Sequence, residues 1–171
     1  MGTRSRIGVM HGDNLKSVYC HWDGYLDHNG RILLANYDST KANFLVALGD
    51  ISSLGSEIGE KHAFSQFDLP ADQVEAFKAL TEDMCTFYGR DRGEDGTKAK
   101  RFADFKDYRA NHQYEEYEYC LRTDGHWYVS QYGRPYELLG DAIANEMKER
   151  PGWSIPIKAA LAMILNACSP R

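Results

Sequence analysis

The stretch YEEYEYCLRTDGHWYVSQYG, residues 114–133, decides the fold class of this chain. Aromatic and β-branched residues occupy both halves of the stretch, as is typical of β-strands. Thr123, Asp124 and Gly125 lie between the halves, and an Asp-Gly pair favours a tight turn between antiparallel strands. The pattern therefore predicts a β-hairpin from Tyr117 to Tyr132.

A second hairpin is expected near the beginning of the chain. Ser5–Val9 and Leu15–His21 are strand-like, and HGDN (11–14) supplies the Gly, Asp and Asn that a tight reversal requires. A hairpin, an aromatic stretch with Gly and a helix follow one another at 6–37 and again at 117–148. The matched residues are few, so this echo is as consistent with coincidence as with duplication.

Apolar residues at helical spacing predict the other regular elements. The expected helices are NGRILLANY (29–37), STKANFLVALG (39–49), LPADQVEAFKALTEDM (69–84), KRFADFKDYRAN (100–111), RPYELLGDAIANEMKER (134–150) and IKAALAMILNAC (157–168). Ser39 or Thr40 is the expected N-cap of the second helix, and Gly49 its stop. Residues 50–70 are expected to form an ordered loop over a cleft, and 85–100 a short strand followed by a charged loop.

Two sequential hairpins and these helices predict one α+β domain over residues 1–171. Sequential hairpins favour an antiparallel sheet with helices packed on one face. The net charge of −5 is spread along the chain, which argues against duplex nucleic acid as a partner but allows a local basic pocket for a small anion. No membrane span is expected, because the longest apolar run is short and contains Lys158. Cys20, Cys85, Cys120 and Cys168 are predicted to be reduced thiols.

The main candidate for a functional site is YCHWDGYLDHNG, residues 19–30. Strand alternation would place Tyr19 and His21 on one face and Cys20 and Trp22 on the other. The aromatic cluster fits core packing, ligand binding, or catalysis by an imidazole–carboxylate pair of His21 and Asp23. We assign no catalytic residue. No metal site is expected, because the histidines lack further ligands at zinc spacing.

Arginines supply the candidate groups for an anion. In YGRDRGEDG (88–96), Arg90 and Arg92 flank Asp91, and their guanidinium groups suit a phosphate or carboxylate as well as local ion pairs. Arg4 and Arg6 would share one strand face, either as a small cationic shelf or as charges on an edge strand. The loop is not a P-loop, because its glycines lack the G-K-[ST] ending.

Four segments resemble a group of small bacteriophage and prophage proteins. These segments are MGTRSRIGV (1–9), SVYCHWDGY (17–25), LVALGDISSLG (45–55) and CTFYGRDRGE (85–94). The resemblance implies a phage setting and the host cytoplasm, and it carries no activity. Tasks suited to that setting are blocking a host enzyme, sequestering a defence signal and adjusting nucleotide metabolism.

These observations lead to three hypotheses for function. The first is a non-enzymatic protein that sequesters a nucleotide-like host defence signal, without a cofactor, in a cleft where residues 19–30 and the arginine loop converge. Its predicted ligand-binding residues are Arg4, Arg6, Tyr19, His21, Trp22, Asp23, Tyr25, Arg90 and Arg92. The second is a protein-binding inhibitor of a host defence or metabolic enzyme. The third is a hydrolase or transferase that uses His21 and Asp23; homo-oligomerisation is compatible with each.

Overall fold

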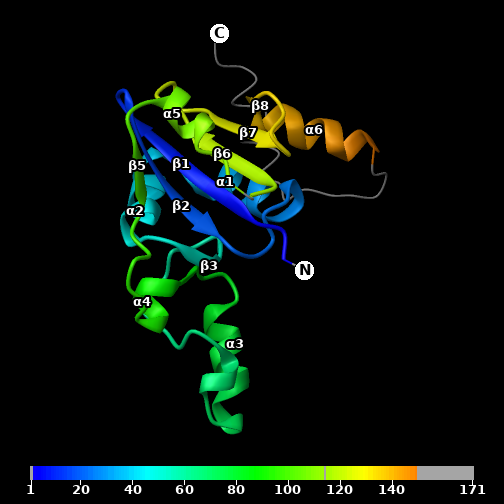
Figure 1. Ribbon diagram of the computed structural model, residues 1–171. Coiled ribbons are helices and arrows are strands. Elements are labelled where there is room, and N and C mark those ends of the chain that lie inside the picture. Colours follow the sequence, from blue (N-terminus) through cyan, green and yellow to red (C-terminus); the bar gives the residue numbers. More distant parts are fainter. Residues whose placement is uncertain (1, 114, 150–171) are drawn as a thin grey trace.

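A computed structural model describes residues 2–113 and 115–149 (Figure 1). In this part of the chain, strands form one sheet in the order β4-β3-β2-β1-β6-β7-β8, and β5 also pairs with β2. The strands are β1 (Ser5–His11), β2 (Asn14–Cys20), β3 (Ile51–Ser53), β4 (Thr86–Phe87), β5 (Lys100–Phe102), β6 (Tyr117–Leu121), β7 (Trp127–Gln131) and β8 (Glu137–Leu138). The α+β class expected from the sequence is confirmed.

Both predicted hairpins are present, and they meet at the centre of the sheet. β1 pairs antiparallel with β2, and β6 pairs antiparallel with β7. The contact between the hairpins is parallel, with Ile7 opposite Tyr119. The sheet is therefore mixed rather than antiparallel throughout, because the long connection between β2 and β6 lets β6 run in the direction of β1.

Helices cover both faces of the sheet instead of the single face expected. The helices are α1 (Arg31–Asn36), α2 (Ser39–Leu48), α3 (Val74–Thr81), α4 (Tyr88–Arg92), α5 (Phe105–Ala110) and α6 (Leu139–Glu149). Helices α1, α2 and α6 contribute Leu33, Leu45 and Ile143 to the main core. Helix α5 packs Tyr108 on the opposite face, where Gly8 leaves room: a Cβ at Gly8 would lie 3.1 Å from Tyr108 Cζ.

Several short elements differ from the sequence-based expectation. The N-cap of α2 is Asp38, whose carboxylate accepts from Lys41 N at 2.8 Å, while Gly49 ends the helix as predicted. Part of the expected charged loop is α4, and the starts of two expected helices are the strands β5 and β8. Strand β5 forms because it pairs with β2, a partner far away in the sequence.

Between β3 and β4 the chain leaves the sheet as an arm, residues 58–84 (Figure 1). The 58–84 arm contains α3 and the short helices η2 (Gln66–Asp68) and η3 (Ala71–Gln73). Its two ends meet at a neck, where Glu57 N donates to Asp83 O and Cys85 N donates to Glu57 O, both at 2.8 Å. No residue of α3 is buried. The arm is therefore fastened at its neck and projects away from the core.

Three of the cysteines lie in the interior. Cys20, Cys85 and Cys120 are buried and free of disulfides. Cys168 and the expected helix 157–168 lie outside the described residues. Within the described part of the chain, no helix has the length and apolar character needed to cross a membrane.

Candidate functional site

Residues of the stretch 19–30 lie in two different places in the structure. Tyr19 and His21 share a side, as alternation predicts, and the Tyr19 hydroxyl lies 3.0 Å from His21 Nδ1. Strand β2 ends at Cys20, and the chain then turns through Asp23 into the π-helical segment η1 (Leu26–Gly30). This turn directs Asp23 and His28 toward a cleft whose lining residues do not include Tyr19 or His21.

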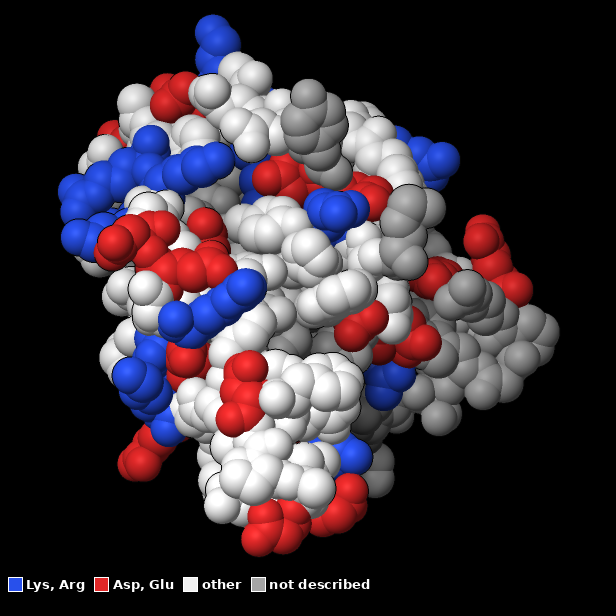
Figure 2. Space-filling view, turned by 60° about the horizontal axis from the view of Figure 1, so that its bottom comes forward, with Lys and Arg blue, Asp and Glu red and all other residues white. Residues whose placement is uncertain are grey.

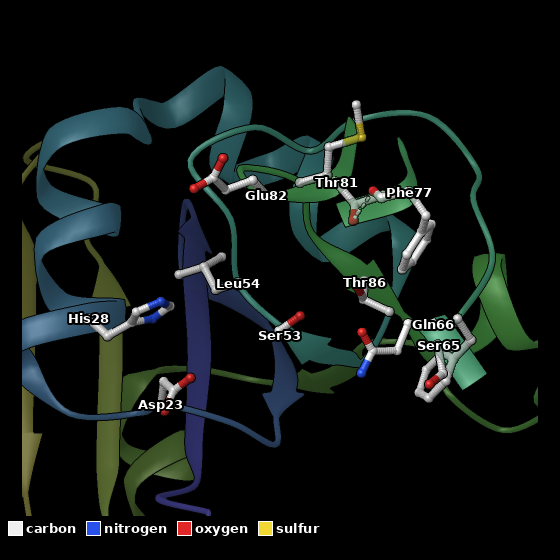
Figure 3. A pocket seen from close by; sticks show the side chains of 12 residues that line it. Asp23, His28, Ser53, Leu54, Ser65, Gln66, Phe77, Thr81, Glu82 and Thr86 are labelled. Carbon is white, nitrogen blue, oxygen red and sulfur yellow. Dashed lines mark hydrogen bonds between the residues drawn. The ribbon is translucent and has the colours of Figure 1, made fainter. Parts of the chain in front are cut away.

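The cleft has a volume of about 360 Å³ and lies between the sheet and the 58–84 arm. Figure 3 shows Asp23 and His28 on one side, with Phe77, Ser65 and Gln66 from the arm on the other. Its lining is completed by Ser53, Leu54, Phe64, Thr81, Glu82, Met84 and Thr86. Two aromatic rings and many hydrogen-bonding groups thus face one space.

The local backbone fixes Asp23 at the edge of this cleft. Asp23 has a φ of 56°, in the left-handed region that Asp and Asn tolerate better than most residues. Its carbonyl accepts from Asn29 N at 3.2 Å, and its Oδ1 accepts from the Tyr25 hydroxyl at 3.2 Å. Burial, followed by the charge of Asp23, raises the pKa of Tyr25, so the phenol stays protonated and orients the carboxylate.

The tautomer of His28 follows from its neighbour Asn29. The buried Asn29 amide nitrogen donates to Ser5 Oγ at 3.1 Å and to Trp22 O at 3.3 Å. Asn29 Oδ1 is therefore an acceptor, and His28 Nδ1, which lies 3.0 Å away, donates to it. In a neutral His28 the other ring nitrogen, Nε2, is then an acceptor.

Of the two arginines in the 88–96 loop, Arg92 lies near the cleft. Its Cζ lies 5.0 Å above the ring of Phe64, which lines the cleft. The guanidinium is half exposed and forms an ion pair of 3.0 Å with the partly exposed Glu94. Such exposed pairs contribute little stability, so Arg92 can exchange Glu94 for an anionic group of a ligand.

Arg90 instead joins the two sides of the neck of the arm. Its guanidinium donates to Ile58 O at 3.0 Å, Gly59 O at 2.7 Å and Cys85 O at 2.8 Å, which belong to both sides of the neck. It also pairs with the fully buried Asp91 at 2.7 Å. These donors are used inside the chain, which makes Arg90 a structural residue and removes it from our set of ligand-binding residues.

Arg6 is likewise held inside the protein. Helix α5 covers the Arg6 side chain, and only 4% of this residue is exposed. The Arg6 guanidinium donates to Glu118 Oε2 and to Tyr108 O, both at 2.8 Å, and its Cζ lies 3.8 Å above the Tyr108 ring. Glu118 also bonds to Tyr136 and His112. This buried network therefore joins β1, β6 and α5, and Arg6 does not belong to an exposed cationic shelf.

The remaining predicted residues form a surface cluster of Arg4, Tyr19, His21 and Trp22. The rings of His21 and Trp22 are 4.6 Å apart, and Trp22 is 45% exposed. Burial, and then the charge of Arg4, lowers the pKa of His21. Because His21 bonds to Tyr19 while Asp23 bonds to Tyr25, the two residues of the suggested catalytic pair have different partners.

Sequence reasoning missed the wall that the arm contributes to the cleft. Phe64, Gln66, Phe77 and Glu82 all belong to this wall. The available signal was the Gly- and Ser-rich segment 50–70 with scattered apolar residues, which suggested a loop over a cleft without naming its lining. Sequence reasoning likewise gives His28 no role in ligand binding.

The described residues include no group of three or more His, Cys, Asp or Glu side chains placed to hold a metal ion. On the side drawn in Figure 2, Lys and Arg side chains are interspersed with Asp and Glu, and uncharged residues lie between them. Family models, curated proteins and solved structures give no match to this chain. Its function is therefore argued from the site's own chemistry.

Proposed function

We propose that this chain is a non-enzymatic binding protein whose cleft, between the sheet and the 58–84 arm, holds a nucleotide-like small molecule. One observation carries this proposal. Phe64 and Phe77 line the same cleft of about 360 Å³ as polar side chains from the opposite wall. A concave site of this size with aromatic walls and a few convergent polar groups is typical of small-molecule sites.

Each part of such a ligand has a matching group. Phe77 offers a ring surface to a base, and base–aromatic stacking contributes about 1–3 kcal/mol per base. Phe64, which also packs against Tyr88, adds an apolar contact in the same space. Arg92, beside Phe64, offers a guanidinium to a phosphate. Ser53, Ser65 and similar side chains offer hydroxyl groups to a sugar. Asp23 and Arg92 remain ligand-binding residues in this proposal, whereas the aromatic contacts with a base come from Phe64 and Phe77 rather than from Tyr19, Trp22 and Tyr25.

The biological setting in this proposal comes from the resemblance to phage proteins. A phage-encoded protein that binds a host nucleotide signal in the host cytoplasm weakens defence by lowering the free concentration of that signal. Binding without turnover is sufficient for this role. A binding role without catalysis also agrees with the observation that His21 and Asp23 form hydrogen bonds with different tyrosines.

Titration calorimetry with GMP, AMP, CMP and UMP tests the proposal. We expect at least one of these nucleotides to bind, and Phe77→Ala to weaken its binding by about tenfold or more because a stacking surface is lost. Phe67→Ala is the matched control, since Phe67 lies on the same arm but is 88% exposed. Absence of binding by all four nucleotides, or equal effects of the two variants, would contradict the proposal.

A second candidate function is inhibition of a host protein, and the exposed apolar side chains of the arm favour it. Phe67 is 88% exposed and Leu80 is 64% exposed, and such residues are enriched where proteins meet. This function predicts that a Phe67→Ser, Leu80→Ser double variant loses a host partner. In the nucleotide-binding function, the same variant keeps its affinity for the nucleotide.

A further inference from the structure

The ionisable and imidazole groups in the cleft are biased toward accepting hydrogen bonds. Among its described lining residues, the charged ones are Asp23 and Glu82, and both are acids. His28 Nε2 adds an acceptor, because Nδ1 of the same ring donates to Asn29. Arg92 is not among the lining residues, and its Cζ lies 5.0 Å from the centroid of the Phe64 ring. The serine, threonine and glutamine side chains of the lining can both donate and accept, so the charged groups and the imidazole decide the preference, and they favour a ligand that brings hydrogen-bond donors.

Asp23 is the better oriented of the two carboxylates. The Asn29 N–H fixes its backbone carbonyl, and the Tyr25 hydroxyl binds Oδ1 at 3.2 Å. A carboxylate accepts about four hydrogen bonds in total, so both oxygens retain capacity for a ligand. In Figure 3 the Asp23 side chain points toward Ser53 and the interior of the cleft. Glu82 is an exposed residue at the end of the arm's helix.

Nucleobases differ in the donors that they present to such a carboxylate. Guanine carries two adjacent donors, N1–H and the 2-amino group, which match the two oxygens of one carboxylate in the way that an arginine fork does. Adenine and cytosine place an amino group beside a ring-nitrogen acceptor, and that acceptor repels a carboxylate. Uracil places N3–H between two carbonyls. Hypoxanthine keeps N1–H and lacks the amino group.

From this geometry we infer that the cleft selects guanine, with Asp23 accepting from N1–H and the 2-amino group while Phe64 and Phe77 contact the ring. The inference rests on the proposed nucleotide-binding function and names the class of nucleotide. Asp23 and His28 are half-buried, and a base that covers them without supplying donors leaves these acceptors unpaired, which costs more than a difference in shape alone. The cleft should therefore discriminate between GMP and AMP more strongly than a cleft that distinguished the two bases by size alone.

Calorimetric titration of GMP, IMP and AMP into the wild type and Asp23→Asn tests this inference. The wild type is expected to bind GMP at least about tenfold more tightly than IMP or AMP. Asp23→Asn should lower GMP affinity by about tenfold or more and leave AMP affinity unchanged. Asn tolerates the left-handed backbone of residue 23, and the circular dichroism spectrum and unfolding temperature verify that the variant folds.

Glu82→Gln is the matched control, because it removes the other carboxylate of the cleft. Equal binding of GMP and AMP would overturn guanine selection while leaving the proposed function intact. Loss of the preference in Glu82→Gln but not in Asp23→Asn would overturn the role of Asp23. Tighter binding of agmatine than of GMP would show a guanidinium site for a non-nucleotide ligand. Absence of binding by GMP, IMP and AMP would overturn this inference, and the proposed function would fall with it only if CMP and UMP also failed to bind.

Discussion

The sheet and the 58–84 arm are held in place in opposite ways. Every residue of β6 is buried, and helices pack on both sides of the central strands. The arm's helix α3 has no buried residue, and the arm's position depends on hydrogen bonds at the neck. Ile58, at the start of the arm, also packs in the main core. Stability is therefore concentrated in the sheet, whereas the shape of the cleft depends on a few contacts at one end of the arm.

A buried ion pair supports each region, and the two pairs have different effects. Arg6 and Glu118 join secondary-structure elements of the sheet layer at 2.8 Å. Arg90 and Asp91, at 2.7 Å, join the two sides of the neck. Removing a partner from the first pair should weaken the whole fold. Removing a partner from the second should release the arm.

The largest effect is expected for Glu118→Ala. It leaves Arg6 buried without its carboxylate, and breaking a buried ion pair in this way costs about 3–5 kcal/mol. Urea unfolding measures the loss. Glu94→Ala is the control, because Glu94 belongs to an exposed pair with Arg92 and should change stability by less than about 1 kcal/mol. Equal losses in both variants would contradict the distinction between buried and exposed pairs.

Asp91→Ala should act locally. The fully buried Asp91 carboxylate accepts from Phe87 N at 2.7 Å and His62 N at 3.2 Å in addition to Arg90. Losing these bonds should raise the opening equilibrium of the arm by about a hundredfold. Hydrogen exchange should accelerate in residues 58–84 while the amides of β1 and β6 keep their protection. Uniform acceleration across the chain would show that arm and sheet unfold together.

A smaller effect is expected at the neck for Gly55→Ala. A Cβ at Gly55 would lie 2.2 Å from Asp83 O, so backbone must move, at a cost of about 1–3 kcal/mol. We expect a lower unfolding temperature and weaker nucleotide binding, because the neck sets the position of the arm's wall. Gly12→Asn is the control: a Cβ there meets open space, and Asn tolerates its φ of 61°. Unchanged unfolding and binding in Gly55→Ala would refute the role of the neck.

The smallest effect is expected for Phe67→Ser on the arm. Phe67 is 88% exposed, and substitutions at such positions usually change stability by less than about 0.5 kcal/mol. Urea unfolding and nucleotide titration should both match the wild type. A marked loss of stability would mean that the arm packs on something in solution, which would favour the protein-binding function.

The sequence predicts the elements that its local signals specify. Asp124-Gly125 marks the turn of the second hairpin, and Gly49 marks the end of α2. Strand β5, at Lys100–Phe102, escapes such reasoning because its pairing with Leu15–Ser17 is remote in sequence. Short elements of this kind take their structure from distant partners rather than from their own propensities.

The candidate site shows the same limit. Composition singles out the stretch 19–30, and alternation predicts that Tyr19 and His21 lie together, as they do. Alternation also predicts Trp22 on the other face, but its ring lies 4.6 Å from the His21 ring because strand β2 ends at Cys20. No sequence pattern predicts the structural role of Arg90, because its partners are the backbone carbonyls of Ile58, Gly59 and Cys85. A carbonyl carries no residue identity, so a sequence pattern does not reveal it.

The reactivity of the buried cysteines can report local unfolding of this protein. Burial raises the pKa of Cys20 and of Cys120 to about 12 and also raises the pKa of Cys85, so all three remain unreactive thiols at neutral pH. With Cys168 replaced by Ser, an alkylating reagent modifies the chain only when these sites become exposed. The alkylation rate of Cys20 and Cys120 then reports how often the central strands separate, and the alkylation rate of Cys85 reports how often the arm is released.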